Sequence, residues 1–453
     1  MSERHLDFAF QWEAVGNDVP ELYHTMARLS LSVNNYSLTR NEDCWSRTVK
    51  DDVLVALYPL ASWLASSWWR LLYEPHPGKG VRPSMSWRMA HELASANQGF
   101  IWPTVMFATD GEGIQLWSRP SDESVEQSVR YLNGSRFPFF VPVDDFRKGV
   151  SALIDAVLNR LQACGCEDTE LRGLWTLICE ETADTAIARL RAFEAMMGYD
   201  PEECPESLLK TMSQLATTVG EDSLPELMSA LAQGNEFGVQ HEKQIECFFE
   251  LHGIQARPNI PDTSIRGDAG DTQAPWRVAV EDAKIVRDYL GCGLEPIPNS
   301  TLFDALSISS AAIKGYTLEN RSRVSVAIPE NQQGIRFMPR KKHPVARRFE
   351  YARLLGDCMF RRDDEGWLVS SDLGTFRQKY QRAFAAELLC PIEGVKAVMQ
   401  GDYSDSAIDE VAEYFDVSTT TVTNLLANNH LIETEDLVDG NDAWPYRPLA
   451  ARA

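Results

Sequence analysis

Two His-Glu pairs have the residue types that begin a zinc-protease motif. In that motif two imidazoles at i and i+4 on one helical face bind Zn²⁺, and the Glu beside the first activates the bound water. The fourth residue after His91 is Ser95, and the fourth after His241 is Ile245. Neither pair supplies the second imidazole, and we interpret both as ordinary helix residues.

The remaining residues give no sign of a metal or nucleotide site. The eight histidines are scattered, with no HxH, HxxxH or His-Cys cluster. No Gly-rich loop of the GxGxxG or Walker type follows a predicted strand, so a nucleotide cofactor has no support. We expect no cofactor.

The stretch 347–391 contains two helical patterns that resemble a known active site. The first reads RRFEYARLLGD and the second RAFAAELLCP. They resemble the two active-site helices of the ImmA/IrrE metallopeptidase family, which read roughly RRFxxAHELGH and ExEANxFAAELLMP. The resemblance covers about residues 275–432, and the first 270 residues remain unassigned. It implies a zincin-like fold for this part of the chain.

The positions that carry the family's chemistry are changed in this chain. Arg353 and Leu354 stand where the family has its His-Glu pair, Asp357 where it has the second His, and Gln378 and Tyr380 where it has the two acids. Arginine stays protonated and cannot bind a metal, and leucine cannot take a proton. Only Asp357 remains as a possible ligand. The resemblance therefore implies a pseudo-peptidase with no catalytic residue and no metal.

The degenerate site still contains two opposite charges. Asp357 follows Arg353 at i+4 spacing, which places both on one face of a helix and allows an ion pair. If the pair is buried, removing one partner leaves an unpaired charge and costs several kcal/mol. A structural pair is favoured over a role in reading a ligand.

A basic cluster precedes the first of these helices. No acid interrupts the segment MPRKKHPVARR, whose basic residues are Arg340, Lys341, Lys342, Arg347 and Arg348. Such a cluster can bind phosphate or an acidic partner surface. The alternative is a solvated loop that balances nearby carboxylates.

The overall charge argues against nucleic acid as a partner. Acidic residues outnumber basic ones 66 to 43, for a net charge of −23, so the surface repels phosphate backbones. The segment 404–432 resembles a helix-turn-helix, but residues 401–444 contain eleven acids and no Lys or Arg. We predict a packing or protein-docking role for this element. Nucleic acid could bind only through the basic cluster at 340–348.

The pattern of the chain predicts an α+β protein in several parts. Residues 1–145 predict a mixed domain, with a strand at 25–34, a turn at Asn34-Asn35, a helix over 51–74 interrupted or kinked near Pro59, and a hairpin over 100–119. Residues 146–255 predict a helical domain, and the Pro/Gly/Asp-rich residues 256–274 a linker. Residues 275–400 form the pseudo-peptidase part, and 401–453 the acidic, helix-turn-helix-like end.

The cysteines and the hydropathy pattern bear on the compartment. Nine cysteines show no disulfide-framework spacing, which favours reduced thiols. The N-terminus lacks a signal pattern, and no apolar run could span a bilayer. We expect a cytoplasmic protein with no membrane contact.

Together these observations favour a non-catalytic regulatory, sensor or scaffold protein that binds an unidentified protein. The family resemblance implies a bacterial setting of stress response, mobile elements or phage defence. The alternative is an enzyme, either a metallohydrolase with a non-standard ligand set or one whose activity lies in the N-terminal domain.

Overall fold

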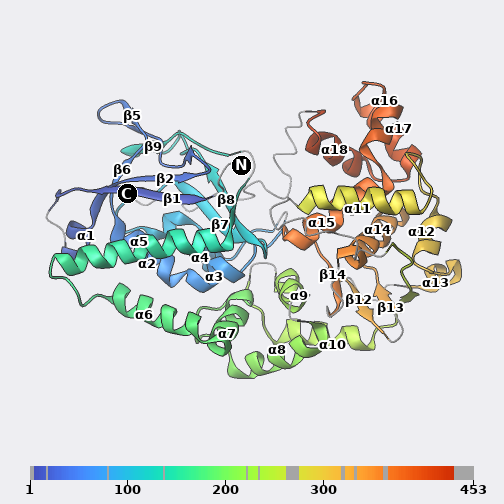
Figure 1. Ribbon diagram of the computed structural model, residues 1–453, viewed down its shortest axis with the longest axis horizontal. Helices are drawn as coiled ribbons and strands as arrows, with labels where there is room; N and C mark the ends of the chain where they lie inside the picture. The colour runs from blue at the N-terminus through green and yellow to red at the C-terminus, as the bar shows by residue number, and fades with distance from the viewer. Residues whose placement is uncertain are drawn as a thin grey trace. The chain divides into compact units, whose positions relative to one another are not determined.

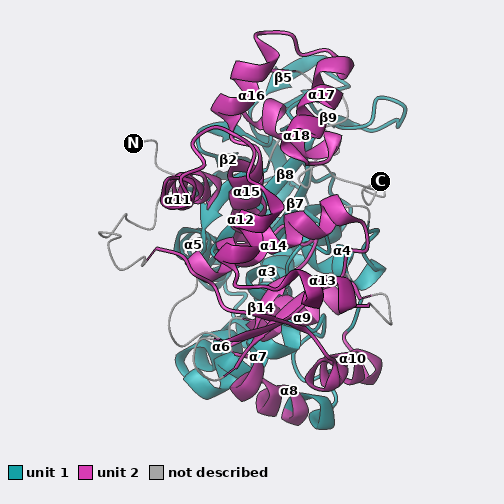
Figure 2. Ribbon diagram, turned by 90° about the vertical axis from the view of Figure 1, so that its right-hand side faces the viewer, with its two compact units in different colours: residues 1–209, 232–236, 439–453 teal, residues 210–231, 237–438 magenta. Residues whose placement is uncertain are grey.

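The computed structural model describes most of the chain in two compact units. The described residues are 5–16, 19–78, 81–135, 138–220, 223–232, 235–261, 275–317, 322–330, 334–360 and 366–432. Within the described residues, unit 1 comprises the chain up to Leu209 with Ala232 and residues 235–236, and unit 2 comprises Lys210–Leu231 and residues 237–432 (Figure 2). The predicted linker residues 262–274 lie outside the described part.

The mixed α+β class predicted from the sequence is confirmed, and the sheets are small and antiparallel (Figure 1). The described part of unit 1 has three of them. The first joins β1 (Leu6–Trp12), β2 (Met26–Val33), β3 (Tyr36–Ser37) and β6 (Val53–Ala56). The second joins β7 (Thr104–Thr109), β8 (Gly113–Arg119) and β10 (Phe139–Pro142). The third joins β4 (Asn41–Asp43), β5 (Thr48–Lys50) and β9 (Val129–Tyr131).

The predicted strand at 25–34 and its turn are confirmed as β2 and the tight turn into β3. Asn34 and Asn35 have φ of 52° and 64°, the left-handed region that asparagine tolerates better than most residues. Leu29 and Leu31 of β2 point into the core, as the alternation of apolar residues predicts.

The predicted helix over 51–74 is wrong at its start. Residues 53–56 form strand β6, which pairs with β2, and the helical part is divided into α2 (Leu57–Ser66) and α3 (Trp68–Tyr73). Pro59 lies in the first turn of α2, where its missing N–H is not needed. Val53 and Val55 satisfy both the helical and the strand pattern, and pairing with β2 decides between them.

The other helices of unit 1 form part of its core or follow it. They are α1 (Pro20–His24), α4 (Met85–His91), the 3₁₀ helix η1 (Leu93–Ala96), α5 (Val143–Ala163), α6 (Glu170–Ala183) and α7 (Thr185–Met196). Trp63, Trp68 and Trp69 are all buried in this core.

Unit 2 is built around one four-stranded sheet and a helix pair. The strand order is β11 (Ile254–Ala256), β13 (Ile335–Met338), β12 (Ser325–Pro329) and β14 (Leu368–Ser370). The helices are α11 (Pro275–Tyr289), α12 (Asn299–Ala305), α13 (Ser310–Gly315), α14 (Pro344–Phe360), α15 (Phe376–Leu389), α16 (Ile392–Met399), α17 (Asp405–Phe415) and α18 (Thr419–Asn428).

The helical middle predicted for 146–255 does not form one unit. Helix α8 (Glu206–Val219) ends in unit 2, and α9 (Ser223–Ala232) and α10 (Val239–Glu250) follow it. The Val219 carbonyl accepts from the Trp367 amide at 2.7 Å. A Cβ on Gly366 would lie 1.9 Å from that carbonyl oxygen, so only glycine allows this approach. No described helix is both long and apolar enough to cross a membrane.

Candidate functional site

The two helices that carry the family resemblance, α14 and α15, pack against each other in unit 2. Pro344 occupies the first position of α14, where proline is favoured, and Thr375 caps α15 by accepting from the Gln378 amide. A Cβ on Gly356 would meet the Phe384 ring at 2.6 Å. Glycine at this position therefore permits the close helix contact.

Arg353 lies between the helices and is held by neutral oxygens. Its side chain is only 4% exposed. Nη2 donates to the Ser371 carbonyl and to Gln381 Oε1, each at 2.9 Å, and also to Gln378 Oε1. Burial, with the nearby charges of Arg382 and Arg340, lowers the pKa of Arg353 to about 9. The guanidinium is thus held by side-chain oxygens of α15 and by a backbone oxygen just after β14.

Gln378, from the other helix, is fixed by the same contacts. Its Oε1 also accepts from the Ser371 amide at 2.7 Å, and its Nε2 donates to the Val369 carbonyl at 2.8 Å. Gln381 Nε2 donates to the same carbonyl at 2.9 Å. The two glutamines therefore join α15 to β14 and the residues just after it.

Asp357 is paired with Arg377 and not with Arg353, contrary to the ion pair inferred from helical spacing. Arg377 Nε and Nη2 donate to the two carboxylate oxygens of Asp357 at 2.8 and 3.1 Å. This bidentate geometry is stronger than a single helix-surface contact. Both oxygens of Asp357 are therefore engaged by one guanidinium.

Leu354 and Tyr380 face the apolar core instead of the polar network. Leu354 is 2% exposed and belongs to the main hydrophobic cluster of unit 2. Tyr380 is fully buried, and its hydroxyl donates to Asp282 Oδ2 of α11. The five predicted positions therefore divide between two sides of the helix pair. Arg353 contacts Gln378, Asp357 lies one turn along α14, and the other two pack elsewhere.

A carboxylate that sequence reasoning missed completes the network. Glu226 of α9 accepts from Thr375 Oγ1 at 2.9 Å and from Ser371 Oγ at 3.2 Å. Burial raises its pKa, although Thr375 and Arg377 oppose the shift. Ser223, at the start of α9, accepts from Arg377 Nη1 at 3.2 Å. The middle of the chain thus supplies part of this site.

The sequence did contain a signal for Glu226. It is the only charged residue in SLPELMSALA, the sequence of α9. Every residue of α9 except Pro225 is buried. A lone acid in a helix that is apolar on all sides predicts a buried partner.

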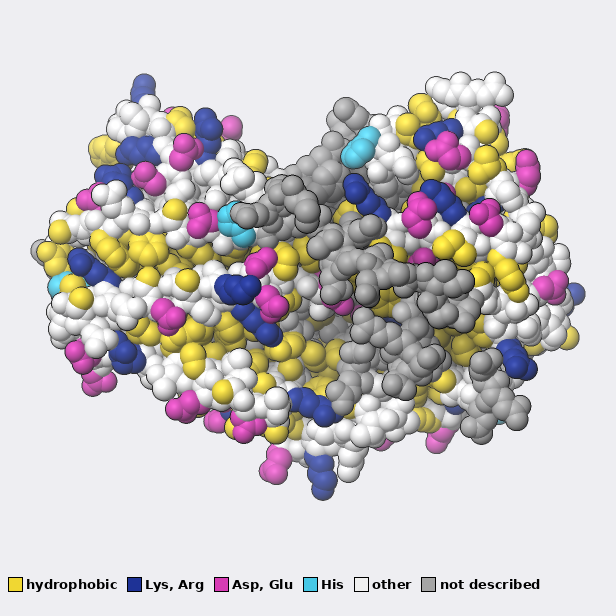
Figure 3. Space-filling view, in the orientation of Figure 1, with side chains coloured by type: hydrophobic (Ala, Val, Ile, Leu, Met, Phe, Trp, Pro, Cys, Tyr) yellow, Lys and Arg dark blue, Asp and Glu magenta, His cyan; other side chains and the backbone are white. Residues whose placement is uncertain are grey.

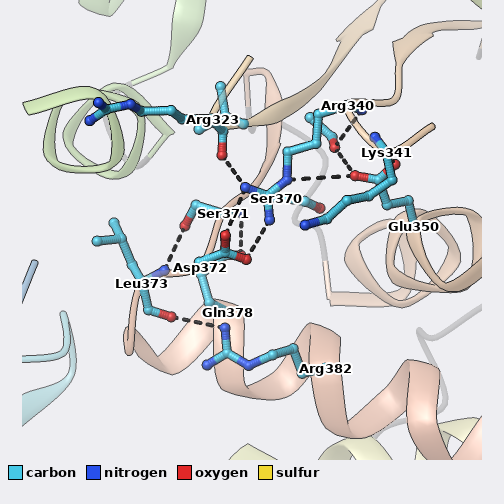
Figure 4. A network of polar contacts seen from close by, with 12 residues as sticks. Arg323, Arg340, Lys341, Glu350, Ser370, Ser371, Asp372, Leu373, Gln378 and Arg382 are labelled. Atoms are coloured by element: carbon cyan, nitrogen blue, oxygen red, sulfur yellow. Dashed lines mark hydrogen bonds and ion pairs between the residues drawn. The ribbon is translucent and has the colours of Figure 1, made fainter. Parts of the chain in front are cut away.

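The five basic residues at 340–348 do not share one environment. The Arg340 side chain is 6% exposed and contacts Asp372 and Glu350, while Lys341 donates its amide to Glu350 (Figure 4). The Arg348 side chain is 4% exposed and donates to Asn299 and to the Ile297 carbonyl, each at 2.6 Å.

The other two residues of the cluster are more accessible. The Arg347 guanidinium lies over the Tyr316 ring, 5.6 Å from its centroid, and Lys342 is exposed. On the face shown in Figure 3, Lys and Arg side chains stand among Asp and Glu, not in one continuous patch. Anion binding by the whole cluster stays a prediction.

The helix-turn-helix-like element is present as α17 and α18. Asp416, with φ of 53°, ends the first helix, and Ser418 caps the second by accepting from the Thr421 amide. Residues 433–444, which hold five of the eleven acids counted in this element, lie outside the described part.

The site as described supplies polar contacts that satisfy one another. Among the described residues, no three His, Cys, Asp or Glu side chains gather where they could hold a metal ion. Comparison with protein-family models, with curated proteins and with solved structures gives no match. The ImmA/IrrE resemblance therefore rests on the sequence alone.

Proposed function

We propose that this protein is a non-catalytic regulatory or sensor protein, built on an inactivated ImmA/IrrE-type peptidase fold, that acts by binding a protein partner. The setting that the resemblance implies is bacterial stress response, mobile-element control or phage defence. The proposal includes the zincin-like layout of unit 2 and a cytoplasmic location.

The observation that supports the proposal is the closed polar network between α14 and α15. The guanidinium of Arg353 stands at a position that a zinc ligand would need, and Asp357 is engaged by Arg377 through both oxygens. Buried polar groups of this kind stabilise one arrangement when every member is satisfied. The helix pair therefore has a structural use that does not need a bound metal.

A metal measurement tests the first half of the proposal. We expect no stoichiometric zinc in the purified full chain after a mild chelator wash, and about one zinc per chain would overturn the pseudo-peptidase reading. Zinc binding should require Arg353→His, Leu354→Glu, Asp357→His and Tyr380→Glu together. No single reversion should suffice, because one or two ligands leave Zn²⁺ under-coordinated.

Partner capture tests the second half. The tagged full chain is used to pull down proteins from the native host, and mass spectrometry identifies them. Charge reversal of Glu123, an exposed loop residue of unit 1, to Arg serves as the control. The proposal requires one protein that is retained by the wild type and by the control, and that binds the purified chain directly. Failure of every captured protein to bind directly would overturn the proposal.

Nucleic acid is expected to bind weakly or not at all at about 150 mM salt, because the net charge is strongly negative. Any binding should depend on the basic cluster at 340–348 and should survive removal of residues 401–453. The reverse result would exchange the roles of these two segments.

A further inference from the structure

Unit 1 contains a cavity that the proposed function does not use. Its volume is about 560 Å³, within the range of small-molecule sites. One wall is formed by α2 and α3, another by α4 and η1, and a third by the start of α6. These elements are distant in sequence from α14 and α15.

The lining of this cavity is rich in hydroxyl groups. Five serines contribute, namely Ser62, Ser66, Ser67, Ser86 and Ser95. Each hydroxyl can donate one hydrogen bond and accept two. The Gln98 amide adds a donor and an acceptor, while Trp63, Met89 and Leu171 provide an apolar wall. Such a surface suits a ligand with several hydroxyls and one apolar face.

The guanidinium of Arg70 also lines the cavity and is held in one orientation. Nε donates to Glu74 Oε2 at 2.6 Å, and Nη1 donates to Ser86 Oγ at 2.9 Å. Glu74 is fixed in turn by His91 Nε2 at 3.0 Å. His91 is fully buried, and its Nδ1 lies 2.8 Å from the Phe107 carbonyl oxygen. Its ring stacks on the Trp87 ring, with 4.0 Å between the ring centroids. The donors of Arg70 are therefore pre-organised.

The charges around the cavity do not favour an anion. Glu74 neutralises Arg70 by direct contact, and Asp200 lies 3.6 Å from its Nη1. Glu170 adds a further carboxylate to the lining. A phosphate or carboxylate ligand would have to compete with these acids, whereas a hydroxyl can use both the carboxylates and the guanidinium as partners.

We infer that this cavity binds an uncharged ring that carries several hydroxyls, the chemistry shared by a monosaccharide and by the ribose of a nucleoside. The hydroxyls of the ligand would exchange hydrogen bonds with the serines, Arg70 and Asp200, and its apolar face would lie on the Trp63 side. This site is independent of the function proposed for unit 2.

The test uses the full chain and two neutral probes, adenosine and D-glucose, in isothermal titration and ligand-observed NMR. Adenosine monophosphate and glucosamine are the charged counterparts. We expect binding of at least one neutral probe, and at least about tenfold weaker binding of adenosine monophosphate than of adenosine, since like charges oppose it. Binding of one probe and not the other identifies the source of the ring.

Ser66→Phe is the blocking variant, because Ser66 is an exposed cavity residue on α2. Ser406→Phe, an equally exposed serine on α17, is the matched control. Binding should be lost in the first and kept in the second, with both unfolding at the wild-type temperature. Ser67→Ala, a smaller change, should weaken binding if Ser66→Phe fails to fold. The inference is overturned if neither neutral probe binds, if the phosphate form binds more tightly, or if Ser66→Phe binds like the control.

Discussion

Arg70 in unit 1 and Arg353 in unit 2 are both almost completely buried, and their charges are compensated in different ways. Arg70 in unit 1 is 3% exposed and contacts the Glu74 carboxylate, while Arg353 in unit 2 is 4% exposed and contacts only neutral oxygens. Asp357, one turn further along the same helix, is paired with Arg377. A buried guanidinium can thus make its hydrogen bonds to neutral oxygens, with no carboxylate in contact to balance its charge.

The pKa values of the two arginines follow this difference. Burial disfavours the charge of Arg70, but the Glu74 and Asp200 carboxylates outweigh it and raise the pKa. Burial lowers the pKa of Arg353 to about 9. Below that pH the charge on Arg353 opposes folding, and the opposition is relieved as the pH rises above about 9, because the folded state then releases its proton before the unfolded state does.

The largest effect in this comparison is expected from Glu74→Gln. The change leaves Arg70 without its contacting carboxylate and His91 without an ionised acceptor, so the free energy of unfolding should fall by about 3–5 kcal/mol. Urea unfolding followed by tryptophan fluorescence measures it, since Trp63, Trp68 and Trp69 lie in this core. Glu206→Gln, at an exposed position, is the control. A loss below about 1 kcal/mol would mean that the two arginines are compensated alike.

Asp357→Asn should have the next largest effect, about 3 kcal/mol, because it removes the carboxylate that accepts two hydrogen bonds from the buried Arg377. A double-mutant cycle with Arg377→Met should give a coupling energy above about 1.5 kcal/mol. A double-mutant cycle of Asp357→Asn with Arg353→Gln should give a clearly smaller coupling energy. Equal coupling in the two cycles would restore the helical ion pair inferred from the sequence.

Arg353→Gln should cost only about 1 kcal/mol in spite of the hydrogen bonds that it removes. Gln378 Oε1 keeps the Ser371 amide as a donor, and Gln381 Oε1 keeps the Ser370 hydroxyl. The loss of an uncompensated buried charge offsets part of the cost. The change in the free energy of unfolding is measured by chemical denaturation, with hydrogen exchange in α14 as the readout for unit 2. A cost similar to that of Glu74→Gln would contradict the neutral compensation described above.

Glu226→Gln is expected to change stability least at pH 7 and to alter its pH dependence. Because burial raises the pKa of Glu226 above the ordinary 4.5, its folded state holds a proton where the unfolded state has lost it. The stability contribution of Glu226 therefore falls as the pH rises from 4.5 through the folded pKa. The free energy of unfolding is measured for the wild type and the variant between pH 4.5 and 7. The difference, wild type minus variant, should decrease as the pH rises. A flat difference would mean that Glu226 titrates normally.

Much of the fold could be predicted from local patterns. The alternation in β2, the Asn34-Asn35 turn and the helical periods of α14 and α15 are each determined within a short stretch of chain. The start of α2 was not predictable, because Val53 and Val55 fit a helix as well as a strand and only pairing with β2 decides.

The contacts that the residues of the candidate site make were less predictable than which residues lie in it. Helical spacing places Asp357 beside Arg353, but the choice of Arg377 depends on how two helices pack. The contact of Glu226 with Thr375 joins residues 149 positions apart, and no local pattern encodes that distance. Its isolation in an apolar helix was the one usable signal.

The most direct test of the account is the double variant Arg353→Gln with Asp357→Asn in the full chain, assayed for partner binding and for biological activity in the native host. The variant removes both charges of the degenerate site while roughly keeping volume, and hydrogen exchange shows whether unit 2 remains folded. We predict that it retains most of its partner binding and activity, with lower stability. Complete loss of activity in a folded variant that still binds its partner would contradict the account and favour an enzyme.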